Sequence, residues 1–212
     1  HNVCEMSIDT YLDPRWGIVD YFLEQKRLGR IRHLGFSSHG QPDNLRLFLE
    51  KYGKDMEFCQ IQLNYMDWTL QDAKEKCDLL NARNIPIWVM EPLRGGRLAA
   101  LSPADTEKLR SVHPDWTAAE WAFRWIAGVP GVKVILSGMS NFTQMQQNVE
   151  TFAAVQPLSA EEDALLLDIG EGMKNSVPCT GCRYCCDSCP MELDIPMMMN
   201  SLNEARFGAQ MG

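Results

Sequence analysis

The chain has 212 residues, enough to bury one hydrophobic core and to carry a small appendage. Its formal net charge of −8 at neutral pH argues against a nucleic-acid partner. No apolar run approaches the ~18 residues that a membrane-spanning helix requires, and the first residues do not resemble a signal peptide. We therefore expect a cytoplasmic protein with no membrane partner.

Four short apolar runs are predicted to form β-strands, at Ile31–Ser37, Phe58–Tyr65, Ile85–Glu91 and Val132–Ser137. The first three begin at residues 31, 58 and 85, an interval of 27 residues. All four runs are apolar on both faces, as strands buried in a parallel sheet are.

Helical patterns separate and follow these strands, at Trp16–Leu28, Pro42–Tyr52, Leu70–Arg83, Pro103–Val112 and Trp116–Ala127. Strands that alternate with helices predict parallel β/α units and an α/β fold. The regular interval further suggests a (β/α)8 barrel of the TIM type, of which about four units are visible.

Polar and glycine-rich residues follow each predicted strand, at Gly35–Gly40, Asn64–Asp67, Glu91–Gly96 and Ser137–Asn141. The active sites of such barrels lie at this end of the strands. After the fourth strand a helix is predicted to begin at Asn141, and Gln144 forms a capping-box-like pair with it.

The C-terminal third is predicted to leave the barrel. A further helix begins at Leu158–Glu162 and runs to about Gly170, and residues 172–178 have the composition of a linker. A last helix is predicted at Ile195–Phe207.

A cysteine run lies between this linker and the last helix. Cys179, Cys182, Cys185 and Cys189 have the spacing C-x2-C-x2-C-x3-C, and Pro190 follows. This spacing is typical of bacterial ferredoxins, in which thiolates hold an iron–sulfur cluster. Because the chain contains one such run, we predict one [4Fe–4S] cluster held by all four thiolates.

Two other interpretations of the run remain open. A disulfide framework needs an oxidising compartment and usually a small secreted chain, whereas cysteine is sparse in the rest of this chain. Zinc accepts four thiolates, but its sites usually consist of two separated C-x2-C pairs. The doublet Cys185–Cys186 also leaves one ligand ambiguous, and the x2/x2/x3 spacing favours Cys185.

Four segments, taken in order, resemble motifs of the aldo/keto reductases: Gly35–Ser37, Gln60–Tyr65, Met90–Gly96 and Ser137–Asn148. The cysteine run points more closely to the bacterial and archaeal branch of that family with a C-terminal ferredoxin-type tail. The resemblance implies residues 1–156 as the C-terminal half of a barrel, 157–177 as a helix and linker, and 178–212 as a small, α-helical, ferredoxin-like [4Fe–4S] domain.

The resemblance implies an oxidoreductase that transfers hydride between a nicotinamide and a small carbonyl or alcohol substrate. His1 matches the catalytic histidine, which donates a hydrogen bond to the carbonyl oxygen. The family's catalytic tetrad also contains an Asp, a Tyr and a Lys, which belong to the first three strands of the barrel. No segment of this chain resembles those three strands. We therefore expect a fragment that begins at the catalytic histidine and is inactive alone.

The nicotinamide contacts are implied at the first strands of this half. Ser37, Ser38 and Gln60 would meet the carboxamide, although the family often has Ser-Asn where this chain has Ser37-Ser38. Met90 occupies the position at which many members stack a side chain on the nicotinamide, and Pro92 and Leu93 would line the pyrophosphate path.

The nucleotide end is implied at the last strand. Ser137, Gly138 and Asn141 lead into a helix N-terminus, which suits phosphate. Gln144 stands where the family commonly has an arginine for the 2′-phosphate, so NADP and NAD both remain open, and Asn148 would contact adenine.

Two functions therefore compete. The first is the C-terminal half of a nicotinamide-linked reductase whose cluster could pass electrons to a ferredoxin-like partner. The alternative is a non-enzymatic protein that uses the cluster for electron transfer or for structure.

Overall fold

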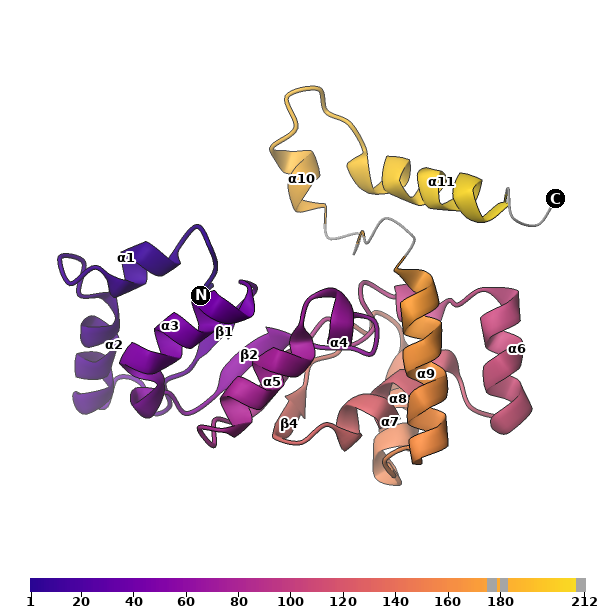
Figure 1. The fold of residues 1–212 in the computed structure, drawn as a ribbon, viewed down its shortest axis with the longest axis horizontal. Helices are drawn as coiled ribbons and strands as arrows, with labels where there is room; N and C mark the ends of the chain where they lie inside the picture. Colours follow the sequence, from indigo (N-terminus) through magenta and orange to yellow (C-terminus); the bar gives the residue numbers. More distant parts are fainter. Residues whose placement is uncertain (175–178, 180–182, 209–212) are drawn as a thin grey trace.

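A parallel four-stranded sheet forms the centre of the computed structural model, which describes residues 1–174, 179 and 183–208. Its strands are β1 (Phe36–Ser38), β2 (Cys59–Gln62), β3 (Ile87–Met90) and β4 (Val132–Ile135), in that spatial order. Figure 1 labels β1, β2 and β4. All four predicted strands are present, although each is shorter than expected. The arrangement is α/β and corresponds to about half of a (β/α)8 barrel, as predicted.

The helices follow the strands in the expected alternation. Their bounds are α1 Ile8–Leu12, α2 Ile18–Arg27, α3 Pro42–Tyr52, α4 Asp67–Leu70, α5 Ala73–Asn81, α6 Pro103–Val112, α7 Ala118–Gly128, α8 Phe142–Ala153, α9 Ala160–Met173, α10 Tyr184–Asp187 and α11 Ile195–Gly208, with 3-10 turns η1 Gly53–Asp55 and η2 Arg97–Ala99. None of the described helices has the length and apolar character needed to cross a bilayer.

The sheet has one covered and one open face. In the paired register, Ser38 lies beside Ile61, which lies beside Val89, and these three side chains are buried. Helices cover this face, and Phe36 packs against Phe48 of α3 with ring centroids 4.5 Å apart.

The opposite face carries a second row of side chains. Ser37 pairs with Gln60, Gln60 pairs with Trp88, and all three are only half-buried. The Trp88 ring also stacks on the ring of Phe58, with the two centroids 4.0 Å apart. A Cβ on Gly35 would lie 2.6 Å from the Phe58 ring. In a closed barrel this face would line the interior.

The N-terminal residues extend the sheet beyond β1. Val3 forms a parallel bridge with Ser38, and its N–H donates to the Ser37 carbonyl at 2.7 Å. Val3 is almost fully buried, whereas Lys133 on β4 is exposed. The chain therefore brings His1 and Asn2 to the carboxyl end of β1, where the barrel's functional residues are expected.

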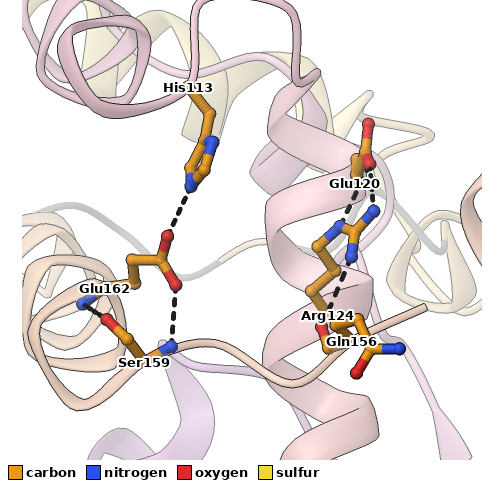
Figure 2. Close-up of polar contacts among 6 residues, drawn as sticks. All are labelled: His113, Glu120, Arg124, Gln156, Ser159 and Glu162. Atoms are coloured by element: carbon orange, nitrogen blue, oxygen red, sulfur yellow. Dashed lines mark hydrogen bonds and ion pairs between the residues drawn. The ribbon is translucent and has the colours of Figure 1, made fainter. Parts of the chain in front are cut away.

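Helix α9 is attached to the end of α6 by polar contacts (Figure 2). Ser159 Oγ accepts the Glu162 N–H at 3.3 Å, and the Glu162 carboxylate accepts the Ser159 N–H at 2.7 Å. The other Glu162 oxygen contacts His113 Nε2 at the end of α6. The Ser159 N–H and His113 lower the pKa of Glu162.

A second contact fastens the segment between α8 and α9 to α7 (Figure 2). Arg124 Nη2 donates to Glu120 Oε1 at 2.8 Å, and Arg124 Nη1 donates to the Gln156 carbonyl at 3.4 Å. The Arg124 guanidinium also lies 4.2 Å from the centre of the Trp116 ring. Together these contacts fix how α9 leaves the barrel half.

We predict that Ser159→Ala lowers the free energy of unfolding by about 1 kcal/mol at neutral pH, the usual cost of removing an N-cap hydroxyl. Because the pKa of Glu162 is lowered in the folded chain, its stabilising contribution is present above the ordinary carboxyl pKa and is lost as the pH falls through the lowered pKa. Urea unfolding at neutral and acidic pH measures both effects. Ser111→Ala, at an exposed hydroxyl inside α6, is the control and should change stability by less than about 0.5 kcal/mol.

Candidate functional site

A cavity of about 800 Å³ opens where β3 and β4 end. Its walls are the turn Met90–Gly96, the loop Leu136–Ser140 and the first turns of α8, with Ala99, Thr117 and Ala119 completing the lining. It therefore lies at the carboxyl ends of parallel strands, where barrels place their binding sites.

The cavity gathers seven of the residues predicted from the sequence to bind a cofactor. Two predicted segments contribute to the same wall, although more than 40 residues separate them along the chain. The seven residues are Met90, Pro92, Leu93, Ser137, Gly138, Gln144 and Asn148.

The β4–α8 loop is shaped by its own side chains. Asn141 Oδ1 caps α8 by accepting the Gln144 N–H at 2.9 Å. Gln144 Oε1 accepts the Ser140 N–H at 2.8 Å, so the return bond of the expected capping pair goes one residue earlier than in a capping box. Asn148 Nδ2 donates to Ser137 Oγ at 3.1 Å and holds the loop against the helix. Asn141 itself does not line the cavity.

The turn after β3 has an unusual backbone. Glu91 and Arg94 have φ values of 55° and 50°, and Gly95 and Gly96 follow at 65° and 91°. Left-handed conformations are costly for residues other than glycine and persist where the surroundings impose them. The Arg94 N–H donates to the Glu91 carbonyl at 3.1 Å, and the Gly96 N–H donates to the Leu93 carbonyl at 3.0 Å.

Such a site can hold an anionic ligand with an extended, partly apolar body. The 12-residue helix α8 begins beside the cavity and lines it from Gln144 onward, and a helix start favours anions through its first N–H groups and the positive end of its dipole. Glu91 and Arg94 are the charged residues of the lining. Among these features, the start of α8 is the one whose chemistry suits phosphate groups.

A band of side chains connects the cavity with the N-terminal residues. His1 Nδ1 lies 3.2 Å from Ser37 Oγ, and Ser37 pairs with Gln60 across β1 and β2. Gln60 Nε2 then contacts Met90 Sδ at 3.5 Å, and Met90 lines the cavity. The predicted residues thus form a continuous row on the open face of the sheet.

Ser38 is placed differently from this row. Its side chain is fully buried on the helix-covered face, where Oγ donates to the Val3 carbonyl at 3.0 Å. The next residue, His39, has its N–H bound to Asn2 Oδ1 at 3.0 Å, and partial burial lowers the pKa of its ring.

One buried polar cluster next to the cavity was not predicted from the sequence. Asp67 and Arg94 form an ion pair, with side chains 0% and 2% exposed. Gln62 and Asn64 complete the cluster. The sequence signal that could have revealed this cluster is an acidic residue, Asp67, after β2 together with an arginine, Arg94, in the glycine-rich turn after β3.

The cysteine run is described at Cys179, Cys185, Cys186 and Cys189, whereas Cys182 lies outside the described residues. Backbone N–H groups of the following residues lower the pKa of Cys189, the largest contribution coming from Leu193. Partial desolvation and the neighbouring Cys186 raise the pKa of Cys185. Within the described part of the chain, no three His, Cys, Asp or Glu side chains are arranged to hold a metal ion.

Comparison with solved structures supports the architecture. Aldo-keto reductase AKR11C1 from Bacillus halodurans, in its holo form, superposes with a TM-score of 0.60 at 24% sequence identity. The aligned region covers 74% of this chain and 56% of the reductase chain. An aldo/keto reductase from Brucella melitensis gives 0.54 at 18% identity, covering 70% of this chain and 52% of its own. The chain thus spans little more than half the length of these structures, and at this identity the likeness establishes the fold.

Comparison of the sequence with curated proteins gives no match. The model of the "Aldo/keto reductase family", by contrast, matches residues 9–170, which is well over half of the chain and includes every wall of the cavity. The chain therefore belongs to the aldo/keto reductase family.

Proposed function

We propose that the chain forms the nucleotide-binding half of an oxidoreductase that interconverts small carbonyls and alcohols with NADPH or NADH. The observation that carries this proposal is the cavity, which joins the β3 turn to the start of α8 and is linked through Met90 and Gln60 to Ser37 and His1.

The residues divide into two groups of contacts. Ser37 and Gln60 would hold the carboxamide of the nicotinamide, and Met90 would lie against its ring. Pro92, Leu93, Ser137 and Gly138 would line the pyrophosphate and ribose, and Asn148 would reach adenine. The buried hydroxyl of Ser38 would support the strand through Val3 and act on the nicotinamide only by that route.

When bound, the nicotinamide would supply the hydride. His1 would then donate a hydrogen bond to the substrate oxygen, where negative charge develops. Its Nδ1 already lies beside Ser37 Oγ, which leaves Nε2 for the substrate. The Asp, Tyr and Lys that donate the proton in this family match no residue of the chain at the corresponding strands, so we propose that these 212 residues do not complete the reaction alone.

The cysteine run would hold a [4Fe–4S] cluster through Cys179, Cys182, Cys185 and Cys189. Its support is the ferredoxin spacing and the chemistry of the donors, since thiolates are the ligands that these clusters take. Such a cluster could exchange single electrons with a ferredoxin-like partner. If the cluster alone is functional, the chain is the non-enzymatic alternative, and it would then bind no nicotinamide nucleotide.

A binding titration tests the proposal. We expect the 212-residue chain to bind NADPH or NADH weakly, and Asn148→Ala to weaken that binding by about tenfold, because it removes an adenine contact and the bond to Ser137. The preferred nucleotide follows from the same titration. Gln146→Ala, an amide on α8 that bonds Glu150 away from the cavity, is the matched control. Equal affinities for the Asn148→Ala variant and the unaltered chain would contradict the assigned adenine contact.

A further inference from the structure

We infer that the buried Asp67–Arg94 pair is a positioning device that sets the β3 turn for the pyrophosphate of the nucleotide. The inference rests on the proposed function and extends it to Asp67, which does not line the cavity, and to Arg94, which lines it but pairs its guanidinium with Asp67.

The pair forms the centre of a closed hydrogen-bond cluster. Arg94 Nε lies 3.1 Å from both carboxylate oxygens of Asp67. Asp67 Oδ2 also accepts from Gln62 Nε2 at 2.8 Å and from Asn64 Nδ2 at 2.7 Å. The Asp67 N–H returns a bond to Asn64 Oδ1 at 2.8 Å, so the carboxylate is fixed to the end of β2.

The cluster holds the β3 turn at two points. At one point Asn64 Nδ2 donates to the Glu91 carbonyl at 3.0 Å, and at the other the Arg94 side chain reaches Asp67. Glu91 and Arg94 are also the two residues of the turn other than glycine that have left-handed backbones. The strained residues are therefore the ones that the cluster clamps, as expected when surroundings impose a costly backbone.

Stability alone does not account for this pair. Burying two charges costs desolvation energy, and apolar side chains of similar size often stabilise a fold equally well or better. In addition, Arg94 Nη1 is buried without a hydrogen-bond partner, which is a further cost. In some proteins, buried polar groups that do not favour stability fix a particular conformation, and we infer that role for this pair.

The conformation fixed here is part of the cavity wall. Every residue of the turn from Glu91 to Gly96 lines the cavity, and Gln144, Gln147 and Asn148 of α8 line it as well. A turn held rigid before binding loses less conformational entropy when phosphate oxygens contact its backbone. The effect should be confined to the pyrophosphate, because adenine is assigned to Asn148 on the other wall.

A double variant separates this role from a structural one. Asp67→Asn with Arg94→Gln removes both charges together, so that no single charge is left buried, and places a shorter uncharged amide where the guanidinium was. We expect its affinity for ADP-ribose, which carries the pyrophosphate, to fall about tenfold, the equivalent of one positioned hydrogen bond. Its affinity for 2′-AMP, which carries adenine without a pyrophosphate, should remain within about twofold.

The ratio of the two affinities is the decisive quantity, because a general loss of folded protein changes both alike. Glu120→Gln with Arg124→Gln is the matched control, a largely buried ion pair on α7 whose members do not line the cavity. If the double variant does not fold, Arg94→Lys keeps the charge facing Asp67 without the planar guanidinium, and the same ratio is measured.

An unchanged ratio, or an equal loss for both ligands, would overturn the positioning role. A failure of the unaltered chain to bind either ligand would instead refute the proposed function, so the two failures are distinguishable. Thermal unfolding of each variant accompanies the titrations and reports any purely structural effect.

Discussion

Replacing Cys185 with serine will abolish cluster binding, whereas replacing Cys186 with serine will leave a [4Fe–4S] cluster in place. The reason is spacing, because Cys185 completes the C-x2-C-x2-C-x3-C pattern with Cys179, Cys182 and Cys189. Purification without oxygen, followed by iron and sulfide analysis, measures the effect. We expect about four iron and about four sulfide per chain in the unaltered protein and in the Cys186 variant.

The paired variants are each other's control, since they make the same substitution at two adjacent cysteines. The structure places Cys185 among exposed residues, while Cys186 is half-buried and its N–H donates to the Arg183 carbonyl at 2.8 Å. The reverse result would reassign the ligand to Cys186. Stoichiometric zinc in place of iron would contradict the cluster itself and favour a four-thiolate zinc site.

Local sequence signals were sufficient for most of the fold. The bounds Pro42–Tyr52 and Pro103–Val112 are confirmed, because proline at the first helical position marks each start. The helix predicted over Leu70–Arg83 is present as α5, but it begins three residues later than predicted, at Ala73, because Asp72 takes a left-handed backbone with φ of 51° between α4 and α5. That break depends on packing around one residue, which a periodic pattern does not contain.

Two other differences have similar causes. Helix α1 was not predicted, because its five residues are too few to show a hydrophobic period. The linker predicted from residue 172 begins too early, as α9 continues through Gly172 to Met173, and the rest of that linker lies outside the described residues except for Lys174.

The two glycines near the end of α9 have different surroundings. Gly172 is exposed, whereas Gly170 is buried, and a Cβ on Gly170 would lie 3.0 Å from the Tyr65 carbonyl oxygen.

In the candidate site, too, contacts between residues close in sequence could be predicted, whereas contacts that depend on the sheet could not. The contacts of Asn141 with Gln144 span three residues and could be predicted from the sequence. The pairing of Asp67 with Arg94 spans 27 residues and depends on the register between β2 and β3. The opposite facing of Ser37 and Ser38 follows from the alternation of a strand, but the partner of Ser38, Val3, could not be foreseen without the sheet.

The 212-residue chain will show no measurable carbonyl reduction with NADPH or NADH, even under conditions in which it binds the nucleotide. General acid catalysis commonly contributes ~10²- to 10⁴-fold, and the Tyr, Lys and Asp that supply it in this family match no residue here. Steady-state assays with a range of small aldehydes and ketones measure this. Turnover at an ordinary enzymatic rate by the chain alone would show that another residue of these 212 donates the proton.

Supplying the first half of a family barrel, fused to the chain or mixed with it, should restore turnover and allow His1 to be tested. In that complete barrel His1→Ala should lower kcat more than it raises KM, because its hydrogen bond strengthens as charge develops on the substrate oxygen. His33→Ala is the control, since this exposed histidine contacts Glu57 before β1 and does not line the cavity. If His1→Ala changed KM alone, His1 would bind substrate without stabilising the transition state, and the row from His1 through Ser37 to Gln60 would serve binding rather than catalysis.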